Sequence, residues 1–222
     1  LLLVCAAASA ASFTLDEIHA TVTLGDGLTG LTPDNLSEHS AWVIQQGQVA
    51  DVLAQQWRDE GILLVGVGSD PDTRLVITAV QDDDAKQYFD LDQQTTKTRT
   101  AYRNKFNKTT FKSEGYVYTK SEWTKSSRYG RMLILQYSYT GAGERHRGYA
   151  YRTIRNGYTI TVDWQVTGGR TLKNKDIKAV ETVMKTFSFT RVLEKPMAAV
   201  SRIVYTETPP AETNTGRFTI RG

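Results

Sequence analysis

The 222-residue chain has a single cysteine, Cys5, and it lies in the apolar stretch that opens the sequence. If that stretch is removed on export, disulfides and thiolate chemistry are both excluded, and the core alone must stabilise the fold. The three histidines lie far apart in the sequence, and none belongs to an HxxxH or HxH pair. A metal site built on histidine or cysteine is therefore not expected.

The motifs of common catalytic and cofactor sites are also missing. There is no G-x-S-x-G motif, and Gly66-Val67-Gly68 is only half of a dinucleotide fingerprint. Asp82-Asp83-Asp84 lacks the glycine and the distal glutamate of a calcium loop, so we interpret it as a solvated turn. The sequence thus predicts no catalytic residue, no metal ligand and no cofactor. A carboxylate pair for glycoside hydrolysis stays open, because its separation of about 5–10 Å is a tertiary property.

Apolar runs long enough to span a bilayer, which takes ~20 residues, are absent as well. The first ten residues form a short apolar run that ends in Ala8-Ser9-Ala10, the small-x-small pattern of signal peptidase sites. We interpret residues 1–10 as a signal peptide remnant and expect a secreted or extracytoplasmic protein of a bacterial cell envelope. Lipidation of Cys5 is the alternative, because the residues before it resemble a lipobox, although Val4 is bulky for that motif.

Basic residues are scarce in the first part of the chain. Residues 1–94 contain three basic and fifteen acidic groups, a net charge of −12, whereas residues 95–222 carry +15, which gives the total of +3. Either the two parts fold onto one another and neutralise locally, or the second part forms a basic face that attracts an anionic polymer or a membrane.

Residues 11–192 carry the patterns of one α+β domain. In its first half we expect strands at 13–15, 20–24, 62–67 and 74–80, with helices from about residue 33 to Gly61 and over 91–106. Gly47 is expected to split the first helical stretch into two helices, since glycine destabilises a helix interior. Asp34 or Asn35 is the candidate N-cap of that stretch.

The second half is rich in strand patterns, at 115–123, 131–139, 149–154 and 158–166. The Asn156-Gly157 pair predicts a type I′ hairpin between the last two strands. Alternating residues in 158–166 predict a strand with one face in the core and one face wet or lightly covered. A closing amphipathic helix is expected at 172–187. These patterns predict an α+β fold with a largely antiparallel sheet flanked by helices.

The composition changes after residue 192. Residues 193–215 include the pair Pro209-Pro210 and have the composition of an extension and linker. Residues 216–222 alternate like the first strand of a truncated domain and resemble the opening of an immunoglobulin-like repeat.

The order of the expected elements resembles the PsbP-like α/β/α sandwich of uncharacterised exported proteins of Gram-positive-type bacteria. The resemblance covers residues 13–190 and rests on the hairpin segment Tyr151–Ile160 and the helix that follows it. It implies the sandwich fold and a binding or accessory role. It assigns no functional residue, because a fold alone does not specify function.

Arginines interleave with tyrosines in the second half of the chain, at Arg128, Arg131, Arg145, Arg147, Arg152 and Arg155. If the turns at 126–130 and 141–148 lie at one end of the sheet, these guanidinium groups converge and would bind an anionic cell-wall polymer or an acidic protein partner. In the alternative interpretation, they are solvated charges that protect strand edges from aggregation.

The leading functional prediction is a non-catalytic binding or accessory module of the cell envelope, with an anionic wall polymer or a protein as its partner. The alternative is a hydrolase of cell-wall carbohydrate that uses paired carboxylates. Export and the lack of an RNA- or DNA-binding motif count against nucleic acid. Membrane association is expected only through a missing C-terminal region or lipidation of Cys5.

Overall fold

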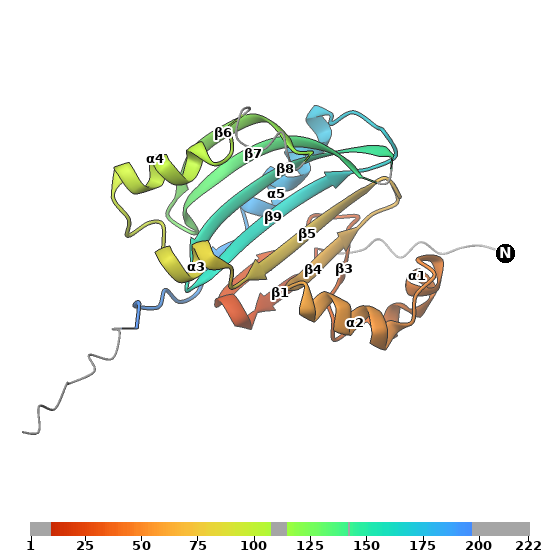
Figure 1. Ribbon diagram of the computed structural model, residues 1–222. Helices are drawn as coiled ribbons and strands as arrows, with labels where there is room; N and C mark the ends of the chain where they lie inside the picture. The colour runs from red at the N-terminus through yellow and green to blue at the C-terminus, as the bar shows by residue number, and fades with distance from the viewer. Residues whose placement is uncertain (1–9, 108–114, 142, 197–222) are drawn as a thin grey trace, which may run out of the picture.

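The computed structural model describes residues 10–107, 115–141 and 143–196. Its main element is a seven-stranded sheet in the order β3-β4-β5-β9-β8-β7-β6, in which all neighbouring strands are antiparallel. Helices lie on both faces of this sheet (Figure 1). The predicted α+β class, a large antiparallel sheet flanked by helices, is confirmed. Most of the predicted signal remnant and linker, and the whole strand at 216–222, lie outside the described residues.

The strands of the main sheet are β3 (Thr29–Leu31), β4 (Ile62–Val67), β5 (Thr73–Val80), β6 (Val117–Ser126), β7 (Gly130–Gly141), β8 (Glu144–Arg155) and β9 (Tyr158–Val166). A small second sheet contains β1 (Ser12–Leu15), β2 (Ala20–Thr23) and β10 (Ser188–Phe189). The helices are α1 (Ser40–Gln45), α2 (Ala50–Asp59), α3 (Asp83–Tyr88), α4 (Thr96–Asn104) and α5 (Asn174–Met184), with short 3-10 turns η1 (Asp16–Ile18) and η2 (Leu36–His39). None of these helices is long and apolar enough to span a membrane.

The largest core lies between one face of the main sheet and a layer formed by α5 and the small sheet. Strand β9 contributes Ile160, Val162 and Trp164 to this core, and α5 contributes Val180 and Val183. The alternation in 158–166 therefore places every second side chain on the buried face, as predicted from the sequence.

The opposite face of the sheet is covered in two separate places (Figure 1). Over β3, β4 and β5, helices α1 and α2 form a core that includes Leu53, Trp57 and Val76. Over β7 and β8, the segment of α3 and α4 forms another core around Tyr102 and Leu133. The polar residues of β9 lie between these two cores, so a strip across the middle of this face has no helix over it.

The predicted turns form where glycine and asparagine supply the left-handed backbone they need. Asn156 and Gly157 have φ angles of 56° and 77°, as a type I′ hairpin requires. Gly47 and Gly61 both have a φ of 68°; the first separates α1 from α2, and the second follows the end of α2. These three predictions are confirmed.

Two local predictions are wrong. The acidic triplet at 82–84 is not a simple turn, because Asp82 is the N-cap of α3 and its Oδ1 accepts the Ala85 N–H at 2.8 Å. The helix expected over 91–106 begins only at Thr96. The segment before it is bonded to the sheet instead, because the Leu91 N–H donates to the Ile154 carbonyl of β8 at 2.9 Å.

The N-cap prediction for Asp34 or Asn35 also needs correction. Asn35 occupies the cap position of η2, but its side chain makes no capping hydrogen bond. Its Oδ1 instead accepts the backbone N–H of Thr32 at 2.7 Å, and its Nδ2 donates to the Gly30 carbonyl at 3.1 Å. The asparagine therefore closes the turn before the helix, a role that Asn side chains commonly take.

Candidate binding groove

The two arginine-bearing turns lie at opposite ends of β7. The β6–β7 turn follows the pairing of Ser126 with Gly130, whereas the β7–β8 turn follows the pairing of Gly141 with Glu144. The condition for a single convergent patch is therefore not met. Arg128, Arg131 and Arg155 are near the first turn, Arg145 and Arg147 near the second, and Arg152 lies between them.

The arginines near the first turn are held by groups of the protein itself. Arg155 Nη2 lies 2.6 Å from Asp92 Oδ2 and 3.5 Å from Asp90 Oδ1, and only 7% of its side chain is exposed. Arg131 Nε lies 3.4 Å from the other Asp92 oxygen, and Arg128 donates to a backbone carbonyl at the end of α5. This group is an internal charge cluster with one exposed arginine beside it.

The other three arginines are also engaged. Arg145 donates to Ser138 Oγ at 3.3 Å, and Arg147 donates to the Gly169 carbonyl at 2.9 Å. Arg152 donates to Tyr102 Oη at 3.0 Å and to Thr161 Oγ1 at 3.1 Å, and lies 3.6 Å from Asp82. The structure does not bring the six residues together, and binding of an anionic ligand by them stays a prediction.

The uncovered strip of the sheet instead holds a depression with two adjoining parts, which we call the cross-sheet groove. One part, of about 470 Å³, lies between α1–α2 and strands β4, β5 and β9. The other, of about 250 Å³, lies over β9, β8 and β7 beside α4. Val76, Thr78 and Gln165 line both parts, so the two parts adjoin one another.

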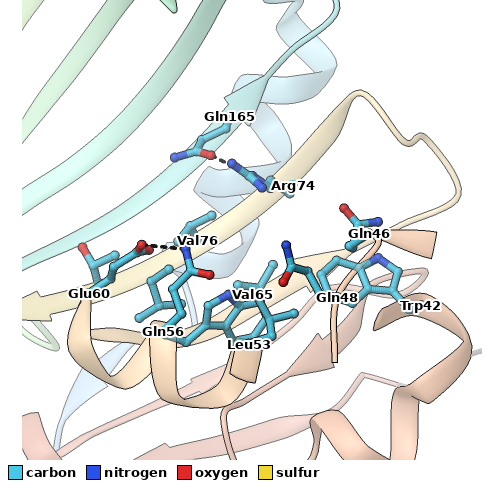
Figure 2. A pocket seen from close by; sticks show the side chains of 13 residues that line it. Trp42, Gln46, Gln48, Leu53, Gln56, Glu60, Val65, Arg74, Val76 and Gln165 are labelled. Carbon is cyan, nitrogen blue, oxygen red and sulfur yellow. Dashed lines mark hydrogen bonds between the residues drawn. The ribbon is translucent and has the colours of Figure 1, made fainter. Parts of the chain in front are cut away.

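The helical wall of the groove presents amides and an indole. Gln46 and Gln48 flank Gly47 and are exposed, and within the described part of the chain neither side chain forms a hydrogen bond. Trp42 is half-buried and meets Trp57 edge to face, with ring centroids 6.1 Å apart. Figure 2 shows Trp42, Gln46 and Gln48 on one side of the pocket and Arg74 with Gln165 on the other.

A chain of hydrogen bonds crosses the floor of the groove. Arg74 Nε donates to Gln165 Oε1 at 2.8 Å, as Figure 2 shows, and Gln165 Nε2 donates to Asp163 Oδ2 at 3.0 Å. The same carboxylate oxygen accepts the Tyr137 hydroxyl at 2.6 Å. The strand alternation puts Asp163 and Gln165 on the same face of β9, opposite the core side chains. This chain fixes the orientation of the Gln165 amide.

Asp163 is the buried charge-bearing group of the groove floor. It is 8% exposed, and its second oxygen, Oδ1, has no hydrogen-bond partner in the described part of the chain. Burial raises the pKa of its carboxyl, and the hydrogen bonds from Tyr137 and Gln165 and the charge of Arg74 offset this only in part. Burial and the neighbouring Asp163 also raise the pKa of Tyr137, which keeps its hydroxyl a donor.

Aromatic rings gather at the far end of the groove. Tyr116 stacks on Tyr139 with centroids 4.9 Å apart, and it lies 5.6 Å from Tyr137 and 6.0 Å from Tyr118. Tyr116 directly precedes β6, Tyr118 is in β6, and Tyr137 and Tyr139 are in β7; Tyr116, Tyr118 and Tyr137 line the groove. The groove thus has aromatic surfaces at both ends and polar groups between them.

Of the residues that line the groove, only Arg152 is among the site residues predicted from the sequence. One sequence feature that indicates the others is the alternation along β9, where Thr161, Asp163 and Gln165 alternate with core residues. The polar loop Gln46-Gly47-Gln48 is a second such feature. Nothing local shows that the two helical layers leave this strip open. In the described residues there is also no group of three or more His, Cys, Asp or Glu side chains that could hold a metal ion.

No known protein family matches this chain, and no curated protein is significantly similar to it in sequence.

Proposed function

We propose that this chain is a non-catalytic binding module of the cell envelope or extracellular space, and that the cross-sheet groove holds its ligand. The observation that carries this proposal is the groove itself, with accessible polar and aromatic side chains over the central strands. Pockets of this kind, with a few placed polar groups among aromatic ones, are the usual form of a ligand site. The signal-like start of the sequence supports an extracytoplasmic location.

The position of the groove on the central strands favours specific recognition by side chains. β5, β9 and β8 are each paired on both sides, so their backbone groups are used within the sheet. Such strands hold side chains more rigidly than loops do, which lowers the entropy lost on binding.

Two neighbouring glutamines of α2 provide a matched test. Gln56 lines the groove and donates to Glu60 at 2.9 Å, whereas Gln55 is outside the groove and donates to Asp59 at 2.8 Å. In pull-downs on purified Gram-positive wall material, we expect Gln56→Ala and Gln165→Ala to weaken binding while Gln55→Ala leaves it unchanged. Absence of binding, or equal binding by all three variants, would contradict the proposal.

The same pull-down tests the arginine hypothesis. If an anionic polymer binds at Arg145 and Arg147, then retention falls with salt and falls again in Arg145→Ala and Arg147→Ala. If the groove holds the ligand, both variants retain wild-type binding.

A hydrolase of wall carbohydrate is the second candidate, and one observation favours it. Asp163 has a raised pKa, as a general acid requires, and Glu60 lines the same groove. Asp90, the other described carboxylic acid with a raised pKa, is not its partner. Asp90 contacts Arg155 at the β8–β9 hairpin, whereas Asp163 lies five residues along β9 from Tyr158, a distance of roughly 17 Å at the rise of a strand.

The hydrolase would be established by release of reducing ends from wall polysaccharide that is lost in Glu60→Gln.

A further inference from the structure

Resting on the proposed function, we infer that the ligand of the cross-sheet groove is an uncharged oligosaccharide. The charge of the groove lining is balanced. Each part has one acidic and one basic side chain, Glu60 and Arg74 in one part and Asp163 and Arg152 in the other. Arg74 and Arg152 are both engaged by neighbouring side chains. A groove without net charge offers no attraction to an anionic or cationic ligand.

The hydrogen-bonding groups of the groove suit a ligand that both donates and accepts. A glutamine amide makes up to four hydrogen bonds, and Gln165 uses two of them, with Arg74 and Asp163, which leaves one N–H and one lone pair for a ligand. Gln46 and Gln48 add exposed amides, and Thr78 adds a half-buried hydroxyl. Groups that both donate and accept are the complement of sugar hydroxyls, which also do both.

The aromatic rings of the groove are placed to suit a ligand made of sugar rings. The half-buried indole of Trp42 lies at one end of the groove, and the rings of Tyr116 and Tyr118 lie at the other. Flat apolar faces with polar edges suit the C–H faces of sugar rings, with hydroxyls reaching the amides between them. The lining runs from β4 to β7, four strand spacings or about 19 Å, which is longer than one sugar ring and fits an oligomer.

An extended peptide would also offer donors and acceptors, but this site does not suit it. Peptides bind sheets by adding a strand to an exposed edge, where backbone groups are unpaired. The groove floor is formed by β5, β9 and β8, whose backbone groups pair with neighbouring strands on both sides. A peptide in the groove could therefore bind only to side chains and would lose the backbone pairing that sheets offer to peptides. A sugar needs no such pairing, because side chains alone recognise it.

The test is a calorimetric titration of the full chain with uncharged oligosaccharides released from the wall material and freed of phosphate. We expect saturable binding that is indifferent to salt between about 0.05 and about 0.5 M. Gln48→Ala and Gln165→Ala should weaken it at least tenfold, and Trp42→Ala should do so if it folds. Gln55→Ala should change the affinity less than twofold. Gln48 is exposed, so its variant cannot lose binding through unfolding.

Two control titrations separate the failure of this inference from that of the proposed function. An uncharged decapeptide and polyglutamate are titrated into the same protein, with the glutamine side-chain amides followed by NMR. If either perturbs the Gln48 and Gln165 amides while no released oligosaccharide does, the groove is a binding site and the oligosaccharide class is wrong. If wall material is retained equally by all groove variants, the proposed function is itself wrong.

Discussion

The hydroxyl of Tyr137 and the carboxyl of Asp163 meet across an intervening strand, with Oη 2.6 Å from Oδ2. Tyr137 is on β7 and Asp163 on β9, and β8 lies between them. Gly148 of β8 is the register partner of Tyr137, and a Cβ at this glycine would lie 2.4 Å from the ring Cζ and the hydroxyl. The missing side chain at Gly148 is what lets the tyrosine lie over β8 and reach the floor of the groove.

Asp163→Asn should become more stable relative to the wild type as pH rises. An unfolded aspartate titrates near ~3.9, and burial holds the folded pKa above that value. The folded state therefore binds more protons in this window, so the stabilisation due to the protonated carboxyl is complete below about pH 4 and is lost as pH rises through the folded pKa. Asparagine has no such loss. Urea unfolding of both proteins from about pH 4 to about pH 8 measures the difference.

The sign of the slope decides this prediction. A stability difference that stays constant over the pH range would show that the Asp163 pKa is not raised. A difference that favours the wild type increasingly at higher pH would show that it is depressed. Asp26→Asn, in an exposed turn, is the control for the loss of one negative charge.

Gly148→Ala should destabilise the protein and break the contact between Tyr137 and Asp163. The new methyl group would overlap the tyrosine ring, and such overpacking costs about 1–3 kcal/mol. Displacement of the ring would also leave Asp163 with one hydrogen-bond donor fewer, which raises its pKa further. Gly25→Ala, where the nearest atom would be 3.9 Å from the Cβ, should change stability by less than about 0.5 kcal/mol. Equal unfolding midpoints for the two variants would contradict this account.

The parts of this structure that the sequence predicts are those governed by local rules. The alternation in 158–166 and the Asn156-Gly157 turn each depend on residues a few positions apart, and both are confirmed. The role of Asp82 was missed because it depends on a residue that is distant in the sequence. Its Oδ1 also accepts Thr159 Oγ1 at 2.7 Å, a partner 77 positions away in the sequence.

The groove was missed for the same physical reason. The polar side of β9 was foreseen as wet or lightly covered, but its neighbours Trp42 and Tyr137 come from segments that meet only after the sheet forms. The arginine hypothesis depended on two turns lying at one end of the sheet. In an antiparallel meander, successive turns lie at opposite ends, so that condition fails for β6–β7–β8.

Arg155→Ala should be among the most destabilising of the arginine substitutions, because it leaves a buried carboxyl without its partner. Asp90 is 2% exposed, and burial already raises its pKa against the opposing charge of Arg155. Breaking a buried ion pair by removing one partner costs about 3–5 kcal/mol. The cost should grow as pH rises above about 4, since loss of Arg155 raises the folded pKa of Asp90 further while the carboxyl of the unfolded chain ionises at its ordinary pKa. Thermal and urea unfolding across this range give the measurement.

Arg128→Ala is the matched control, because Arg128 is exposed. In the described residues, the only hydrogen bond of its side chain is donated to the backbone carbonyl of Lys185. Its cost should stay below about 0.5 kcal/mol. The double variant Arg155→Met with Asp90→Asn should recover part of the loss, because neither side chain is then charged. If Arg155→Ala is as mild as Arg128→Ala, the internal charge cluster does not stabilise the fold.

Asn156 joins the β8–β9 hairpin to two distant segments, so its substitutions should separate backbone from side-chain effects. Its Nδ2 donates to the carbonyls of Ile18 at 3.1 Å and Arg191 at 3.0 Å, and its Oδ1 accepts the Leu193 N–H at 2.8 Å. Asn156→Gly keeps the positive φ and loses these bonds, at a cost of about 1–3 kcal/mol. Asn156→Ala loses the same bonds but keeps a Cβ at a φ of 56°, so it should be about 1–2 kcal/mol less stable than the glycine variant. Chemical denaturation ranks the variants, and hydrogen exchange at Leu193 reports the lost bond directly.

Equal stability of the glycine and alanine variants would show that the turn tolerates either residue. Unchanged hydrogen exchange at Leu193 in Asn156→Gly would show that the Asn156 side chain does not hold the segment after β10.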